Sequence, residues 1–175
     1  KGGLLSYGKA KSDILRWLKE DQHVDVRFTT MFDLYRLPTD FPGYYQATQS
    51  DPYTRIEALE HALAKDINDQ RFIPYIQVHE FETLIFADPT KLATEYLGYE
   101  NKLATLQAIS QEKNPELIND GVDTAPSKRI IQVIPEYSKA VGGINVVAAI
   151  GLDKIRQRCH HFQEWLKKLE TLSTN

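Results

Sequence analysis

The stretch Ile73–Pro89, IPYIQVHEFETLIFADP, changes character halfway along. Up to Val78 it is mainly apolar and aromatic, which predicts a buried β-strand. His79, Glu80 and Glu82 follow directly behind that strand. Acidic side chains are almost never fully buried unless they are paired, protonated or bound to a cation. This junction therefore either faces water at the edge of a sheet or holds a binding partner.

A further strand is predicted upstream, over residues 24–35, VDVRFTTMFDLY, and it ends near Asp33. A long loop with several prolines and a helix over residues 50–69 separate the two strands. From Glu80 to the end of the chain the apolar spacing is mainly helical. Strand, helix, strand and then many helices predict an α/β fold, with a small, mostly parallel sheet and a helix-rich C-terminal half.

The length of 175 residues suits a single domain. We expect residues 1–175 to form one α/β domain, with residues 98–175 as a helical subregion packed on it. Two strands are few for a sheet that stands alone. The chain begins with Lys1 rather than Met, and a further strand preceding Lys1 would complete the sheet.

Composition narrows the class of protein. The single cysteine, Cys159, cannot form an internal disulfide, which predicts a reducing cytoplasm and a core-filling role for this side chain. No apolar run approaches the ~20 residues that span a bilayer, so no membrane partner is expected. The formal net charge of −3 gives no global reason to expect nucleic-acid binding, although it is compatible with a local basic patch.

Acidic residues are expected at the ends of both predicted strands. Ligands bind beyond the carboxyl ends of parallel strands, which brings Asp33 within reach of Glu80 or Glu82 if the strands are neighbours. Oxygen ligands from two or three carboxylates suit Mg²⁺ or Mn²⁺. Glu80 and Glu82 share a face only if the backbone is still extended, because in a helix they diverge by roughly 200°. Alternatively they decorate a helix N-terminus, where negative charge is favourable by about 0.3–1 kcal/mol.

The stretch TAPSKRI carries a second candidate site. Pro126 suits the first turn of a helix, and Thr124 suits its N-cap. Ser127, Lys128 and Arg129 then lie at the helix start, where backbone N–H groups, a hydroxyl and two cations can meet a phosphate. Ordinary helix capping with a solvated charged face is the alternative.

Four stretches gain meaning when they are taken together: TTMFDLYRLPTDFPG, FIPYIQVHEFETLIFADP, INDGVDTAPSKRI and IGLDKIRQRCHHFQEWLKKLE. In this order they resemble the landmarks of a bacterial family labelled domain of unknown function 4276 (DUF4276). The resemblance covers nearly the whole chain. That family looks related to Toprim-like proteins, including the RloB-like group. Its members are often encoded beside an ATPase of the SMC/ABC type in phage-defence loci.

A Toprim-type site implies a glutamate after a first strand and an acidic motif after a later strand, which together bind Mg²⁺ for phosphodiester chemistry. Asp33 matches the later acid. Tyr35 stands where a second aspartate is usual, and the first-strand glutamate has no counterpart in this chain. The HEFE landmark adds Glu80 and Glu82 to the candidate site residues.

The resemblance therefore implies a Mg²⁺- or Mn²⁺-dependent nuclease-type domain of a defence system. Its implied catalytic residues are Asp33, Glu80, Glu82 and Lys128, of which the three acids would hold the metal. The residues implied to bind the substrate phosphate are His79, Ser127, Lys128 and Arg129. The alternative, favoured by the incomplete acidic set and the negative net charge, is a non-catalytic subunit that binds and regulates an SMC/ABC-type ATPase.

Overall fold

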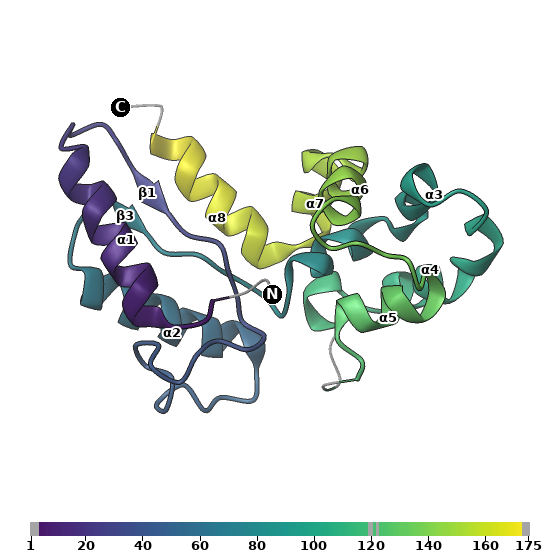
Figure 1. Ribbon diagram of the computed structural model, residues 1–175, viewed down its shortest axis with the longest axis horizontal. Coiled ribbons are helices and arrows are strands. Elements are labelled where there is room, and N and C mark those ends of the chain that lie inside the picture. The colour runs from purple at the N-terminus through teal and green to yellow at the C-terminus, as the bar shows by residue number, and fades with distance from the viewer. Residues whose placement is uncertain (1–3, 119–120, 122, 173–175) are drawn as a thin grey trace. The chain divides into compact units, whose positions relative to one another are not determined.

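The computed structural model describes residues 4–118, 121 and 123–172 (Figure 1). By its internal contacts the chain divides into an N-terminal unit, Lys1–Val78, and a C-terminal unit, His79–Asn175. The C-terminal unit begins at His79 and includes the helical subregion expected over residues 98–175. The segment directly after residue 79 packs against the helices that follow it.

The N-terminal unit contains two parallel pairs of short strands. β1 (Phe28–Thr29) pairs with β3 (Phe72–Ile73), and β2 (Phe32–Asp33) pairs with β4 (Ile76–Gln77). Both predicted strands are thus confirmed, and each is interrupted near its middle. Pro74 lies at the interruption and lacks the N–H that a ladder requires. There Thr30 Oγ1 accepts a hydrogen bond from Tyr75 N and donates one to Tyr75 O, both at 3.3 Å, so a side chain replaces the backbone ladder.

Two helices complete the core of the N-terminal unit: α1 (Tyr7–Glu20) and α2 (Pro52–Ile67). Both bury one apolar face. The long loop between β2 and α2 packs closely on α2 at Gly43, where a Cβ would lie 2.9 Å from Ala62 Cβ. Gly43 also has a φ of 79°, a left-handed conformation that glycine adopts at no steric cost.

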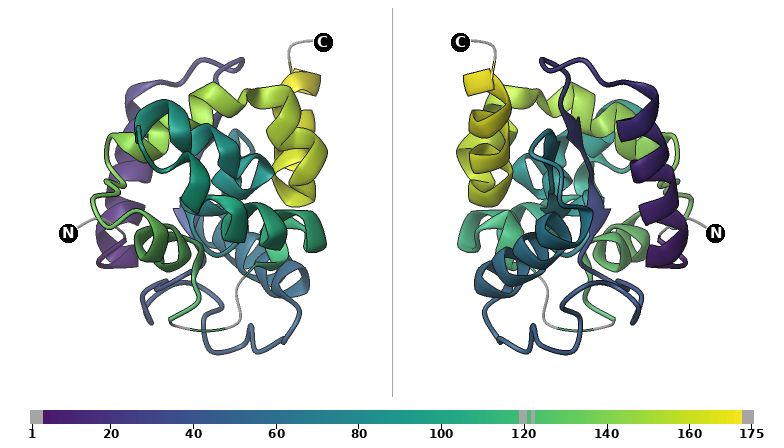
Figure 2. Two further views of the ribbon diagram at one scale, coloured as in Figure 1. Left: turned by 90° about the vertical axis from the view of Figure 1, so that its right-hand side faces the viewer. Right: turned by 90° about the vertical axis from the view of Figure 1, so that its left-hand side faces the viewer.

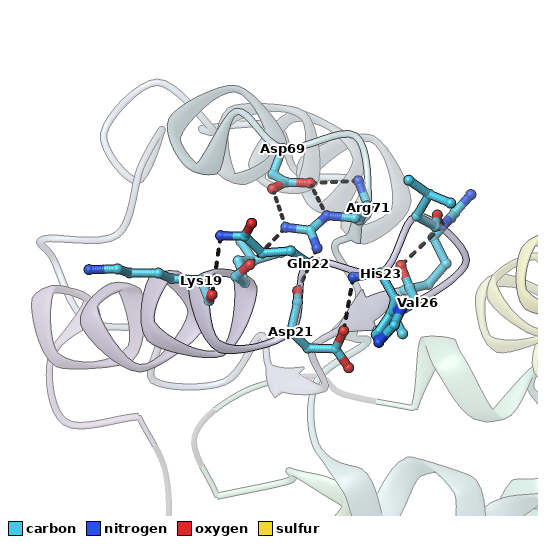
Figure 3. A network of polar contacts seen from close by, with 10 residues as sticks. Lys19, Asp21, Gln22, His23, Val26, Asp69 and Arg71 are labelled. Carbon is cyan, nitrogen blue, oxygen red and sulfur yellow. Dashed lines mark hydrogen bonds and ion pairs between the residues drawn. The ribbon is translucent and has the colours of Figure 1, made fainter.

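Arg71 joins the end of α1 to the start of β3 (Figure 3). Its guanidinium donates to Leu18 O at 2.8 Å and to Asp21 O at 2.6 Å, which satisfies two carbonyl groups at the C-terminal end of α1. Asp69 holds the same guanidinium at 2.9 Å, and this bond lowers the pKa of the Asp69 carboxyl. The pair fixes how the chain enters β3.

The described elements of the C-terminal unit are all helical: η1 (Phe81–Ala87), η2 (Pro89–Lys91), α3 (Leu92–Glu95), η3 (Glu100–Lys102), α4 (Ala104–Glu112), η4 (Pro115–Leu117), α5 (Pro126–Val133), α6 (Gly142–Ile150), α7 (Leu152–Arg158) and α8 (His160–Thr171). η1 is a 3₁₀-helix that is buried from Glu82 to Ala87. It contacts α4, α5, α6 and α7, which gather around it (Figures 1 and 2). η1 is therefore the centre of this unit.

Two further features of the C-terminal unit bear on its chemistry. Cys159 lies between α7 and α8 and is completely buried, which fits the predicted core-filling role. No helix in the described ranges of the chain is both long and apolar enough to cross a bilayer. The fold is thus α/β, with small parallel strand pairs and a helix-rich C-terminal half, as predicted.

Candidate functional site

Glu80 and Glu82 lie at the entrance to η1 and are almost completely buried, at 3% and 2% exposure. His79 precedes them in a left-handed conformation, with a φ of 59°, and is half-buried. Glu80 is the N-cap residue of η1 and is still extended, with φ −140° and ψ 161°, whereas Glu82 belongs to the helix. Because Glu80 has not yet entered the helix, the two side chains reach the same point. The sequence predicts that the two side chains share a face only where the backbone is extended, and Glu80 is the residue of the pair that is extended.

The point where they converge is the ammonium group of Lys139. Its Nζ lies 3.1 Å from Glu80 Oε1 and 3.3 Å from Glu82 Oε2. Lys139 comes from the turn before α6, and its side chain is 50% exposed. Two buried carboxylates of the same charge need a compensating cation, and Lys139 provides it.

Ser127 joins the two candidate sites into one. It donates from its backbone N to Glu80 Oε2 and from its Oγ to Glu80 Oε1, both at 3.0 Å. Ser127 is the second residue of α5, so Glu80 caps this helix from a distant part of the chain. The helix starts at Pro126 as predicted, but the prediction that Thr124 caps it is wrong. Thr124 Oγ1 donates to Gly121 O at 3.3 Å instead.

The other residues of the α5 start are placed differently from one another. Lys128 is exposed, whereas Arg129 is partly buried and donates from Nε to Thr124 O at 2.8 Å. The hydroxyl and N–H of Ser127 hold a carboxylate, the group that carries the negative charge at this helix start. Phosphate binding by Ser127, Lys128 and Arg129 stays a prediction.

Two tyrosines and two glycines border the carboxylates. Tyr137 Oη donates a long hydrogen bond of 3.4 Å to Glu82 Oε1. A Cβ on Gly143 would lie 2.6 Å from Tyr137 Oη, and one on Gly142 would lie 1.8 Å from Tyr96 Oη. The two glycines at the start of α6 therefore leave the space that the tyrosine hydroxyls fill.

Burial and charge oppose each other within this cluster. Burial raises the pKa of Glu82, and the Lys139 ammonium offsets only part of that rise. Burial also acts to lower the pKa of Lys139, but the carboxylates of Glu82 and Glu80 outweigh it, so the pKa of Lys139 lies above its ordinary value. Burial, and next the charge of Glu82, raise the pKa of Tyr137. Lys139 is therefore firmly protonated and Tyr137 neutral at physiological pH.

The donor set fits a divalent cation in part. Glu80 and Glu82 offer carboxylate oxygens that already meet around one cation, and such oxygens are the ligands that Mg²⁺ and Mn²⁺ prefer. Among the residues that the structure describes, no group of three His, Cys, Asp or Glu side chains is arranged to hold a metal. Asp33 is partly buried in β2 opposite Gln77, and it belongs to the N-terminal unit. Its predicted pocket with Glu80 and Glu82 stays a prediction.

Sequence reasoning missed Lys139, Tyr137 and the glycine pair. The two lysine contacts span 59 and 57 residues of sequence, and no spacing rule connects positions that far apart. The available signal was indirect, because buried acids behind a strand are paired, protonated or bound to a cation, and a lysine from elsewhere in the chain is one such partner.

The fold and the cluster together define a class of protein: an α/β chain whose helical unit buries two glutamates around a lysine. A comparison with protein-family models then places the chain. The model of DUF4276, a domain of unknown function, matches residues 1–170, so the chain belongs to this family. No curated protein and no solved structure matches it.

Proposed function

We propose that the chain is a Mg²⁺- or Mn²⁺-dependent, Toprim-like nuclease-type domain that acts on phosphodiester bonds in a cytoplasmic bacterial defence system. One observation carries the proposal: two almost completely buried glutamates converge on one cation. The resemblance of the FDLY and HEFE stretches to Toprim-like landmarks supplies the reaction class.

Each residue has a proposed part in this chemistry. Glu80 and Glu82 would hold the metal, and the Toprim-like resemblance implies Asp33 as a further ligand. A divalent ion would supply Lewis-acid activation for phosphodiester hydrolysis. Lys128 is exposed and would steady the phosphate of a nucleic-acid substrate. Ser127 fixes the Glu80 carboxylate in position through two hydrogen bonds. His79 and Arg129 would complete the phosphate-binding edge.

Thermal melts with and without Mn²⁺ test the proposal. We expect Mn²⁺ to raise the melting temperature, because a ligand at a hundredfold excess over its Kd stabilises the folded state by about 2.7 kcal/mol. The rise should disappear in Asp33→Asn and in Glu82→Gln. Glu82 is preferred to Glu80 for this test, because Glu80 also holds the start of α5.

Glu112→Gln is the matched control, since Glu112 is an exposed acid of the same unit. It should retain the full response to Mn²⁺. A response that survives in Glu82→Gln would exclude this carboxylate as a ligand. Mn²⁺-dependent nicking of plasmid DNA, lost in the same two variants, would then identify the reaction.

A second function, a non-catalytic subunit that regulates an SMC/ABC-type ATPase, is favoured by a different observation. Val141 and Ile144 are apolar and 61% and 59% exposed, and they lie three residues apart beside the start of α6. Both oxygens of Glu80 are also already bonded within the chain. Melts that do not change with Mn²⁺ would favour this second function.

A further inference from the structure

Lys139 is the resident cation of the Glu80–Glu82 pair. Its ammonium is within 3.3 Å of an oxygen of each carboxylate, and the two carboxylates are nearly inaccessible to water. Leaving two ionised groups buried without a cation is strongly unfavourable. A cation at this point therefore allows both carboxylates to stay ionised, whereas without one burial would favour their protonation.

Of the three side chains, Lys139 has the most freedom to leave. Glu80 is fixed by two hydrogen bonds from Ser127, and Glu82 is enclosed within η1. The Lys139 side chain is half exposed and starts from a turn, not from a helix or strand. A lysine side chain has four rotatable carbons, so its ammonium can move into water without displacing the backbone.

We propose that Lys139 is a positioning residue that competes with the divalent cation. It holds the two carboxylates together when no metal is bound, and it leaves when the metal binds. This inference rests on the proposed function, because it concerns the same two carboxylates. Its consequence is that metal affinity is set by the difference between the two cations and not by the glutamates alone.

The test compares Mn²⁺ titrations of the melting temperature for the unmodified chain, Lys139→Met and Lys139→Arg, at mildly alkaline pH. Lys139→Met should melt at a lower temperature without metal, because the carboxylates lose their partner. It should also reach half-maximal stabilisation at about a tenfold lower Mn²⁺ concentration, which corresponds to removing about 1.4 kcal/mol of competing interaction. Lys139→Arg keeps the charge and should need at least as much Mn²⁺ as the unmodified chain.

The control is Lys154→Met, which removes an exposed lysine of α7 and should leave the Mn²⁺ midpoint unchanged. A purely structural role for Lys139 would lower the melting temperature equally with and without Mn²⁺, and this result would overturn the inference. Should Lys139→Met fail to fold without metal, folding restored by Mn²⁺ supports the inference and failure in both conditions overturns it.

The remaining outcomes separate this inference from the proposed function. If the unmodified chain shows a Glu82-dependent response but Lys139→Met has the same midpoint, competition by Lys139 is wrong and the metal site stands. A lower Mn²⁺ requirement in Lys139→Arg than in the unmodified chain would also contradict competition. If neither the unmodified chain nor Lys139→Met responds to Mn²⁺, the metal site and the inference fall together.

Discussion

Gly142 and Gly143 are the residues on which the shape of the polar cluster depends most directly. Each occupies a position where an added methyl group would overlap a tyrosine hydroxyl. Tyr96 is further fixed because its Oη accepts a hydrogen bond from Ser138 N at 3.0 Å. The tyrosines therefore cannot both move aside without breaking bonds near Glu82.

We expect Gly142→Ala and Gly143→Ala to lower the free energy of unfolding by about 1–3 kcal/mol each, the usual cost of overpacking. Urea denaturation followed by circular dichroism measures the loss. Gly8→Ala is the matched control, since Gly8 lies in α1 and a Cβ there would have its nearest neighbour, Ser6 Oγ, at 3.9 Å. That substitution should stabilise the chain by about 0.5–1 kcal/mol. Equal effects at all three glycines would contradict the steric argument.

Of the residues in the polar cluster, only the glutamates could be predicted, because only they stand out from their neighbours in the sequence. Glu80 and Glu82 could be found because acids directly behind a buried strand conflict with their surroundings. Lys139 could not be found, since a lysine near a turn looks the same whether it binds water or a buried carboxylate. Whether Asp33 joins the glutamates is likewise a question of packing that strand ends alone do not decide.

Among the elements, a recurring feature is a helix start capped by an acid from elsewhere in the chain. Glu80 accepts from Ser127 N at the start of α5. Glu116, which is completely buried, accepts from His161 N at 3.0 Å and from Phe162 N at 3.1 Å at the start of α8. Each acid accepts hydrogen bonds from N–H groups that the helix leaves unpaired, and its negative charge is stabilising beside the positive N-terminal end of the helix dipole. These contacts fasten helices that are distant in sequence.

We expect Glu116→Ala to lower the free energy of unfolding of the C-terminal unit by about 1–3 kcal/mol, because the buried N–H of Phe162 and the partly buried N–H of His161 lose their acceptor. Hydrogen exchange should show faster exchange at the amides of His161 and Phe162. Glu112→Ala serves as the comparison, since it removes an exposed acid and should change stability by less than about 0.5 kcal/mol. Unchanged exchange at both amides would show that Glu116 does not hold α8.

The sequence indicated where these helices begin but not what caps them. Pro126 is a local signal with a fixed backbone preference, and α5 begins at this residue as predicted. Thr124 was the best local candidate for the cap, yet Glu80 takes this place from 47 residues away. The same holds at Pro74. The interruption of the strand was predictable from the proline, whereas the hydrogen bonds of the Thr30 side chain to Tyr75 were not.

For the whole molecule, the division into two units allows the stability of each to be measured separately. The chain contains two tryptophans, Trp17 in α1 and Trp165 in α8, so each unit has one. Fluorescence of single-tryptophan variants can follow each unit separately. The α/β class and the parallel strand pairs were predictable from periodicity. Helical structure from Glu80 onward was predictable in the same way. The contacts that gather α4, α5, α6 and α7 around η1 were not, because they join distant parts of the chain.

We expect the C-terminal unit to lose stability as pH rises above about 10. Lys139 and Tyr137 have pKa values raised above their ordinary values of 10.5 and 10.0. A group whose pKa is raised by folding stabilises the folded state below its unfolded pKa, and this contribution is lost as pH rises towards the folded pKa. Trp165 fluorescence in a Trp17→Phe background measures the loss, and Tyr137→Phe should make it shallower. An unfolding free energy that stays constant from neutral pH to well above pH 10 would contradict the raised pKa values.

The buried thiol of Cys159 can report how often the surrounding structure opens. Burial, and next the carboxylate of Glu116, raise the pKa of this thiol, and the chain has no other cysteine. A thiol-specific reagent therefore modifies the chain only during the intervals when the junction of α7 and α8 has opened. The labelling rate, divided by the rate for an unfolded peptide, gives the equilibrium constant of that local opening, and the logarithm of this constant gives its free energy.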